Sequence, residues 1–260
     1  VLTNIGRLHV TTGVAAGIGI GYVIAVTLGV SAWLATRRLG LDRPQAGATI
    51  VSAIVANTGY LGIPLAGTLL GRAAIPAAVA YDLAVSVPVL YLGGFGVGAA
   101  MGTEGGGSVG SRVKTFFTRN LAIPAAILGL VLPASFFSDG LVDASHVLVL
   151  AIAPLGFFAL GVTMTGESEE GELDLPPKVT PPVATAMALR LVVAPALMLT
   201  LSALIVDVPD AYLLAAAMPC GLNALTAAHG YGLDARIVAA AVAWSTALVL
   251  AVCAVAGAVT

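Results

Sequence analysis

Amide and hydroxyl side chains gather around Gly and Pro in two apolar stretches of the chain. The first is the run 57–64, NTGYLGIP, and the second is the run 218–223, MPCGLN. Pro removes a backbone N–H and Gly lets the chain leave the helix. In lipid, the freed N–H and C=O groups need partners from protein or water, so each break predicts a polar cavity at membrane depth. The chemistry that these residues offer is the binding of a polar solute.

The candidate binding residues are the polar and helix-breaking positions of these runs. Helix segments that restart after a break expose unpaired N–H groups and a partial positive charge, which favours a carboxylate or another anion. The candidate set is Asn57, Thr58, Gly59, Tyr60, Gly62, Pro64, Pro219, Gly221, Asn223 and Thr226. The alternative is that Gly and Pro only kink two packed helices, while the Asn side chains bond the freed backbone groups.

Two charged residues lie within other apolar stretches, Asp82 in the run 80–84 and Arg190 in the run 188–192. Ionisable groups inside a membrane face the protein interior, where they pair or line a pathway. Asp82 is therefore expected either to take up a coupling proton or to balance Arg190 in a structural pair. Arg190 has two further options, which are contact with an anionic cargo and extension toward the cytoplasmic interface.

Composition predicts an integral membrane protein. Of the 260 residues, 59% are hydrophobic and 9% are charged, whereas about a quarter are charged in soluble domains. No basic patch for nucleic acid is present. The two cysteines have no Cys or His neighbours at metal-ligand spacing, so we expect no metal and no cofactor. Because no Ser/His or paired-carboxylate arrangement typical of a hydrolase is present, an enzyme is the least favoured class.

Apolar runs of about 20 residues predict eight membrane spans. They cover residues 13–36, 46–70, 74–98, 118–135, 143–165, 181–206, 210–231 and 236–259. The expected division is a first repeat of three helices over 1–98, a cytoplasmic loop over 99–117 and a second repeat of five helices over 118–260. The broken helices are 46–70 and 210–231. Small residues at every fourth position of the first span predict a helix-packing seam; these are Gly13, Gly17, Gly21, Ala25 and Gly29.

Lys and Arg residues predict the orientation. Eight of them follow odd-numbered spans and two lie on the other side, and loops rich in positive charge remain in the cytoplasm. We therefore expect a multi-pass protein of the plasma membrane with both termini outside the cytoplasm.

The interrupted spans are the second and the seventh, so they cross the membrane in opposite directions. Spans one to three then correspond to spans six to eight with inverted topology. Inverted repeats that meet at two broken helices are typical of secondary transporters, which bind their cargo near the midplane. The predicted fold is an all-α membrane protein, an inverted-repeat transporter with two broken crossing helices and about eight transmembrane helices.

These motifs together resemble the auxin efflux carrier family, whose prokaryotic members are permeases. The resemblance rests on the run 57–65, Asp82, the runs 153–161 and 190–195, Met218-Pro219, the run 229–234 and Ser245-Thr246. It covers nearly the whole chain, and the two broken-helix motifs with their spacing carry most of its specificity. One departure is Asn120-Leu121, where the family usually has Asn-Pro.

The resemblance implies a ten-helix fold of two inverted five-helix repeats, of which the eight spans would be helices 3 to 10. The opening two helices are then expected to be absent, with residues 1–12 as a remnant of their connection. In the family, helices 1, 2, 6 and 7 form a scaffold, and the others form a mobile unit in which helices 4 and 9 cross. Small organic anions are the cargo that the family implies, and the movement is elevator-like.

The leading hypothesis is a secondary transporter, a permease or efflux carrier, of a small organic anion such as a carboxylate, bound at the crossing. One alternative is a proton- or sodium-coupled carrier of the bile-acid or antiporter type. Another is a membrane receptor or subunit that retains the fold without transport. The expected partners are an organic anion and the lipid bilayer; a homodimer is left open, and nucleic acid is not expected.

Overall fold

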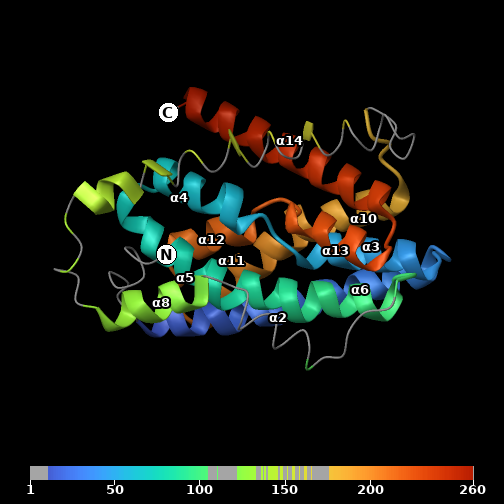
Figure 1. Cartoon of the computed structure of the whole chain (residues 1–260), viewed down its shortest axis with the longest axis horizontal. Helices are drawn as coiled ribbons and strands as arrows, with labels where there is room; N and C mark the ends of the chain where they lie inside the picture. The colour runs from blue at the N-terminus through green and yellow to red at the C-terminus, as the bar shows by residue number, and fades with distance from the viewer. Residues whose placement is uncertain are drawn as a thin grey trace.

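The computed structural model describes residues 11–104, 110, 122–132, separate positions between 136 and 165, and 176–259. Over these residues the chain is helical, and its helices form one elongated bundle (Figure 1). No strand is found in these ranges; the extended backbone there forms an isolated bridge between Ala56 and Cys220. The predicted all-α class is thus confirmed for the described part of the chain.

Four helices in the described ranges are long and apolar enough to cross a membrane, and they match the first, third, sixth and eighth expected spans. The first is α2 (Thr12–Arg38) and the last is α14 (Ala235–Val259). The third expected span comprises η2 (Arg72–Ala74), α5 (Ile75–Tyr81), η3 (Asp82–Ser86), η4 (Val89–Gly94) and α6 (Phe95–Met101). The sixth comprises α10 (Pro181–Ala188), η6 (Leu189–Val193) and α11 (Ala194–Ile205).

The second and seventh expected spans are each divided. The second consists of α3 (Arg43–Ile54), η1 (Thr58–Gly62) and α4 (Ile63–Leu69), and the seventh consists of α12 (Asp210–Ala216) and α13 (Asn223–Tyr231). A membrane span needs about 20 residues, so no half crosses by itself. This explains why these two expected spans are not among the four full-length helices.

The first break lies earlier than the sequence suggests. Only residues 55–57 leave the helix, whereas Gly59, Gly62 and Pro64 belong to the segment that restarts. Pro64 occupies the first turn of α4, where a missing N–H costs little because the first N–H groups of a helix have no partner within it. The expectation that Pro64 interrupts the helix is therefore wrong; it lies just after the interruption.

The fourth and fifth expected spans are only partly visible. α8 (Ala122–Val131) falls within the fourth span. Most of the rest of that span, of the fifth span and of the expected cytoplasmic loop over 99–117 lies outside the described residues. The total of eight spans, the division into repeats and the domain boundaries stay predictions.

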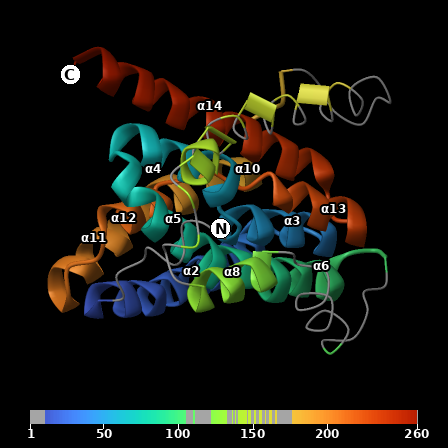
Figure 2. The same cartoon turned by 60° about the vertical axis from the view of Figure 1, so that its left-hand side comes forward.

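Helix α3 lies at the centre of the bundle. It contacts α2, α10, α14 and α6, and Figure 2 shows it between α2 and α14. Residues 46–54 are all buried, including Thr49 and Ser52. A helix that is covered on every side needs small or apolar residues all round, and this segment provides Ala, Gly, Ile and Val. The break that follows α3 is thereby held inside the bundle.

The seam of small residues on α2 packs closely against the second half of the chain. A Cβ atom on Gly17 would lie 2.5 Å from Cδ2 of Tyr212, a fully buried residue of α12. A Cβ on Gly13 would meet the carbonyl oxygen of Asp207 at 2.2 Å. The predicted packing seam is confirmed at these positions. It ends at Gly29, where the added atom would be 3.5 Å from its nearest neighbour, Ile54.

Replacing Gly17 by Leu should lower the free energy of unfolding by about 1–3 kcal/mol, because the new side chain overlaps the buried Tyr212 ring. Gly19→Leu is the matched control, since an added Cβ there meets nothing within 4 Å and the same gain in helix propensity, about 1 kcal/mol, applies to both variants. Thermal unfolding in detergent measures the difference. Equal melting temperatures for the two variants would contradict this packing.

Candidate functional site

The two unwound segments cross and bond to each other. The N–H of Asn57 donates to the carbonyl of Pro219 at 2.9 Å, and the N–H of Gly221 donates to the carbonyl of Val55 at 2.8 Å. These two bonds form the antiparallel bridge between Ala56 and Cys220. Backbone groups that each break takes out of its helix thus find partners in the other break. Such pairing meets the requirement that backbone at membrane depth be bonded within the protein.

Gly221 permits this close contact. A Cβ atom there would lie 2.8 Å from the carbonyl oxygen of Ala56 and 2.9 Å from Cγ1 of Val55. On the other side of the segment, the N–H of Cys220 donates to Oγ of Ser245 in α14 at 3.1 Å. Ser245 is therefore a backbone-bonding residue. Gly221 and Ser245 therefore maintain the crossing itself.

A cavity of about 280 Å³ lies beside the crossing. Its walls come from both breaks and from the middle of the third expected span. The lining residues are Val55, Ala56, Asn57, Thr58, Gly59, Tyr60, Asp82, Ser86, Val87, Leu90, Leu222 and Asn223. Two parts of the chain that are about 160 residues apart thus form one site, as the paired breaks predict.

Asn57 is the most unusual residue of this cavity. It is only 2% exposed, and neither Oδ1 nor Nδ2 of its side chain has a hydrogen-bond partner. A buried polar group without a partner costs about 1–3 kcal/mol. The backbone of the break is bonded to other backbone groups, so the Asn57 side chain does not serve as their partner. Its side-chain amide therefore retains hydrogen-bonding capacity that the described residues do not use.

Asp82 brings a carboxylate to the same cavity. Its Oδ1 accepts a hydrogen bond from Oγ1 of the buried Thr58 at 2.5 Å, and a Cβ on Gly59 would lie 3.5 Å from it. Ser86, one helical turn further on, also lines the cavity. Ser86 is not among the residues predicted from the sequence, although its spacing of four from Asp82 places both on one helix face.

Two helix starts border the cavity. η1 begins at Thr58 and α13 begins at Asn223, and Gly59 and Leu222 lie beside them in the wall. The first N–H groups of a helix have no acceptor within it, and the helix dipole adds a partial positive charge at this end. At α13 the N–H groups of Ala224 and Leu225 donate to the carbonyls of Gly221 and Leu222. Both helix starts contribute positive potential, which favours an anionic group.

The remaining candidates take other positions. Tyr60, 38% exposed, and the exposed Asn223 lie in the cavity wall. Gly62 lies against Met218, whose Cγ would be 3.0 Å from an added Cβ. The residues that do not line the cavity are Gly62, Pro64, Pro219, Gly221 and Thr226. Pro219 and Gly221 bond across the crossing, and Thr226 is exposed on α13.

Arg190 supports one end of the second break. It is 4% exposed, and its Nη2 donates to the carbonyl of Ala216, the last residue of α12, at 2.8 Å. A cation at the C-terminal end of a helix is favourable, since the dipole is negative there. Arg190 therefore neither extends to the interface nor forms an ion pair with Asp82. Within the described residues, the ion pair found joins Arg72 and Asp143.

The chain has apolar helices of membrane length and a polar cavity between two interrupted helices. This architecture is typical of membrane transporters. Comparison with family models supports this class. Residues 113–256 match the model of the family described as membrane transport protein. The match covers more than half of the chain, which therefore belongs to this family, that of the auxin efflux carriers. Comparisons with curated proteins and with solved structures each found no match.

The family match confirms the assignment made from the motifs, and with it a membrane transporter in a membrane location. It also indicates a transporter rather than an enzyme. The matched range contains Arg190, the second break and Ser245, whereas the first break, Asn57 and Asp82 lie outside it. A role of Asn57 and Asp82 is therefore supported by their place in the cavity wall and not by the family match.

Proposed function

We propose that the protein is a secondary transporter of a small organic anion, such as a carboxylate, which binds in the cavity beside the crossing. The observation that carries this proposal is the buried, unpartnered amide of Asn57 between two helix starts. A carboxylate accepts hydrogen bonds from the amide N–H₂ of Asn57, and the positive potential of the two helix starts favours its charge. Charge-assisted bonds of this kind are about twice as strong as neutral ones.

The movement that we propose is elevator-type alternating access. The antiparallel bridge joins the breaks, and each break follows one long apolar helix and precedes another. This order of elements supports an inverted repeat around the crossing, the arrangement in which a cargo site alternates between the two sides. We place the protein in the plasma membrane as a multi-pass carrier with both termini outside the cytoplasm.

Asp82 favours a second feature, the coupling of transport to a proton or sodium ion. Two negative charges 4 Å apart repel by about 4 kcal/mol where the effective dielectric constant is 20. A bound carboxylate shares a cavity of about 280 Å³ with the Asp82 carboxylate, so it binds best when a cation or proton neutralises that side chain. Cargo and cation then enter together.

Flux through proteoliposomes tests the proposed function. Vesicles that contain the protein should take up labelled mono- and dicarboxylates faster than protein-free vesicles, and organic amines of similar size should show no such difference. Equilibrium binding to the purified protein is measured in parallel. Carboxylate binding without flux would indicate a receptor that retains the fold, and selective flux of the amines would overturn the assignment of an anionic cargo.

A further inference from the structure

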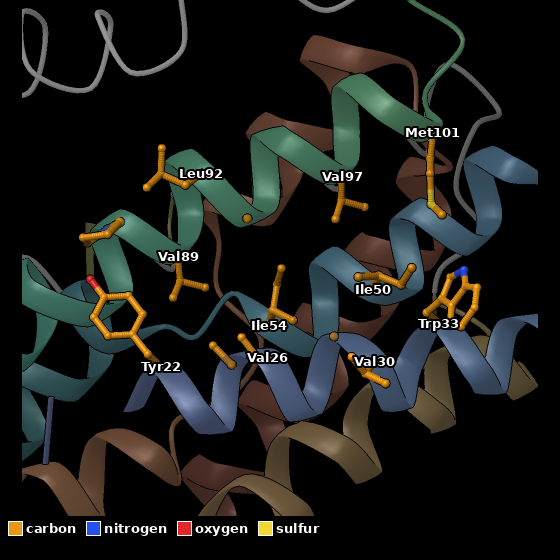
Figure 3. A pocket seen from close by; sticks show the side chains of 14 residues that line it. Tyr22, Val26, Val30, Trp33, Ile50, Ile54, Val89, Leu92, Val97 and Met101 are labelled. Carbon is orange, nitrogen blue, oxygen red and sulfur yellow. The ribbon is translucent and has the colours of Figure 1, made fainter. Parts of the chain in front are cut away.

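A second cavity is almost entirely apolar, and some of its lining residues, such as Ile54 and Val89, are next in sequence to residues that line the cavity at the crossing. This groove has a volume of about 560 Å³ and lies between α2, α3 and the segment η4–α6. Figure 3 shows Val26 and Val30 of α2 on one side and Leu92 and Val97 of the third expected span on the other. Val26, Val30 and Leu92 are exposed. Exposed apolar side chains on membrane-spanning helices face lipid.

The groove extends from Tyr22 at one end to Trp33 and Met101 at the other (Figure 3). At the first end, the hydroxyl of Tyr22 donates to the carbonyl of Ala84 at 2.6 Å and so joins α2 to the third expected span. From Tyr22 to Trp33 the helix rises about 16 Å, close to one leaflet of a hydrocarbon core about 30 Å thick. The groove is therefore as long as one leaflet is deep.

Arginines lie at the end of the groove marked by Trp33 and Met101. The Arg37 guanidinium lies over the Trp33 ring, 5.2 Å from its centroid. Arg43 donates from Nη2 to the carbonyl of Ala100, beside Met101, at 2.5 Å. Arg38 follows Arg37 in the sequence. Arg37, Arg38 and Arg43 are all exposed. Three acids also lie near these helix ends. Asp42 caps α3 through the N–H of Gln45, the N–H of Asp234 donates to the carbonyl of Pro44, and Glu104 follows α6.

We propose that this groove binds one acyl chain of an anionic phospholipid, whose phosphate group lies between Arg37 and Arg43. An apolar groove of leaflet length with arginines at its interfacial end fits both parts of such a lipid. Trp at that end is typical of the membrane–water interface, and basic residues there attract anionic head groups with about 1 kcal/mol each. This site is independent of the cargo site and does not require transport.

Quenching of Trp33 fluorescence by brominated lipid tests the proposal. The chain has two Trp residues, so Trp244→Phe leaves Trp33 as the sole fluorophore. In phosphatidylcholine vesicles, brominated phosphatidylglycerol should quench Trp33 at least about fivefold more effectively per mole than brominated phosphatidylcholine. Equal quenching by the two lipids, or no quenching by either, would overturn the proposal. If the Trp244→Phe variant does not fold, native mass spectrometry of the parent chain measures the same lipid preference.

Three variants separate the parts of the site. Arg37→Gln with Arg43→Gln should reduce the preference for phosphatidylglycerol to about onefold, whereas Arg236→Gln, which removes an exposed arginine outside the groove, should leave it unchanged. Gly29→Leu should fill the groove, because a Cβ there meets only Ile54 at 3.5 Å, and should lower quenching by both lipids. Unchanged preference in the double arginine variant would contradict a head-group role for these residues.

Discussion

Asn57→Ala is expected to raise the KM for carboxylate transport about tenfold to a hundredfold. Among the described residues that line the cavity, Asn57 is the only one with a fully buried polar side chain that has no hydrogen-bond partner. The substitution removes this side chain. Hydrogen bonds to a charged group contribute about 1.5–3 kcal/mol, which corresponds to this change in affinity. Initial rates of uptake over a range of carboxylate concentrations in proteoliposomes give KM and the maximal rate separately.

Ser52→Ala is the matched control for this variant. Ser52 is fully buried in α3, its Oγ also lacks a partner, and it does not line the cavity. Its removal should leave KM unchanged. The backbone bonds of the crossing involve main-chain atoms of residue 57, so they persist in Asn57→Ala. If the KM of Asn57→Ala equals that of the parent protein, Asn57 does not bind the carboxylate.

Asp82→Asn is expected to abolish coupling while flux continues. Asn keeps the shape of the side chain and an acceptor for the Thr58 hydroxyl, but it carries no charge and takes up no proton. A pH difference of one unit supports about tenfold accumulation of an anion that moves with one proton. This accumulation should fall to about onefold in the variant, measured as internal over external carboxylate under an imposed pH or sodium gradient.

Ser86→Ala provides the comparison, because Ser86 lines the same cavity one turn further along the helix and is uncharged. It should retain the gradient dependence of the parent protein. Full accumulation by Asp82→Asn would show that the coupling site lies elsewhere. If accumulation by the parent protein depends on neither gradient, the proposal of coupling fails. The proposal that the anion binds at Asn57 is then unaffected.

The sequence predicted the elements that depend on local signals. Gly and Pro within apolar runs indicated two breaks, and unbroken apolar runs indicated the four helices of membrane length. The match of residues 113–256 confirmed the family. Asn57 and Asn223 were correctly placed beside the breaks, and both lie in the cavity wall.

Local sequence signals do not predict hydrogen bonds between residues that are far apart in the sequence. Nothing near Arg190 in sequence indicates that it bonds the carbonyl of Ala216, and the pairing of Asn57 with Pro219 depends on how the halves pack. Pro64 predicts a break because Pro disfavours helix interiors, yet the first turn of a helix tolerates Pro well. Only the folded structure shows whether Pro64 lies in a helix interior or in a first turn.

Protection of a cavity thiol by cargo tests most directly whether the anion binds beside the crossing. In a chain with Cys220→Ala and Cys253→Ala, Ser86→Cys places a thiol in the cavity, and Thr226→Cys places one on α13 outside it. A transported carboxylate at ten times its Kd should slow modification of the Ser86→Cys thiol by a small methanethiosulfonate about tenfold. The Thr226→Cys thiol should react at the same rate with and without carboxylate. Unprotected reaction of Ser86→Cys at saturating carboxylate would contradict the proposed site.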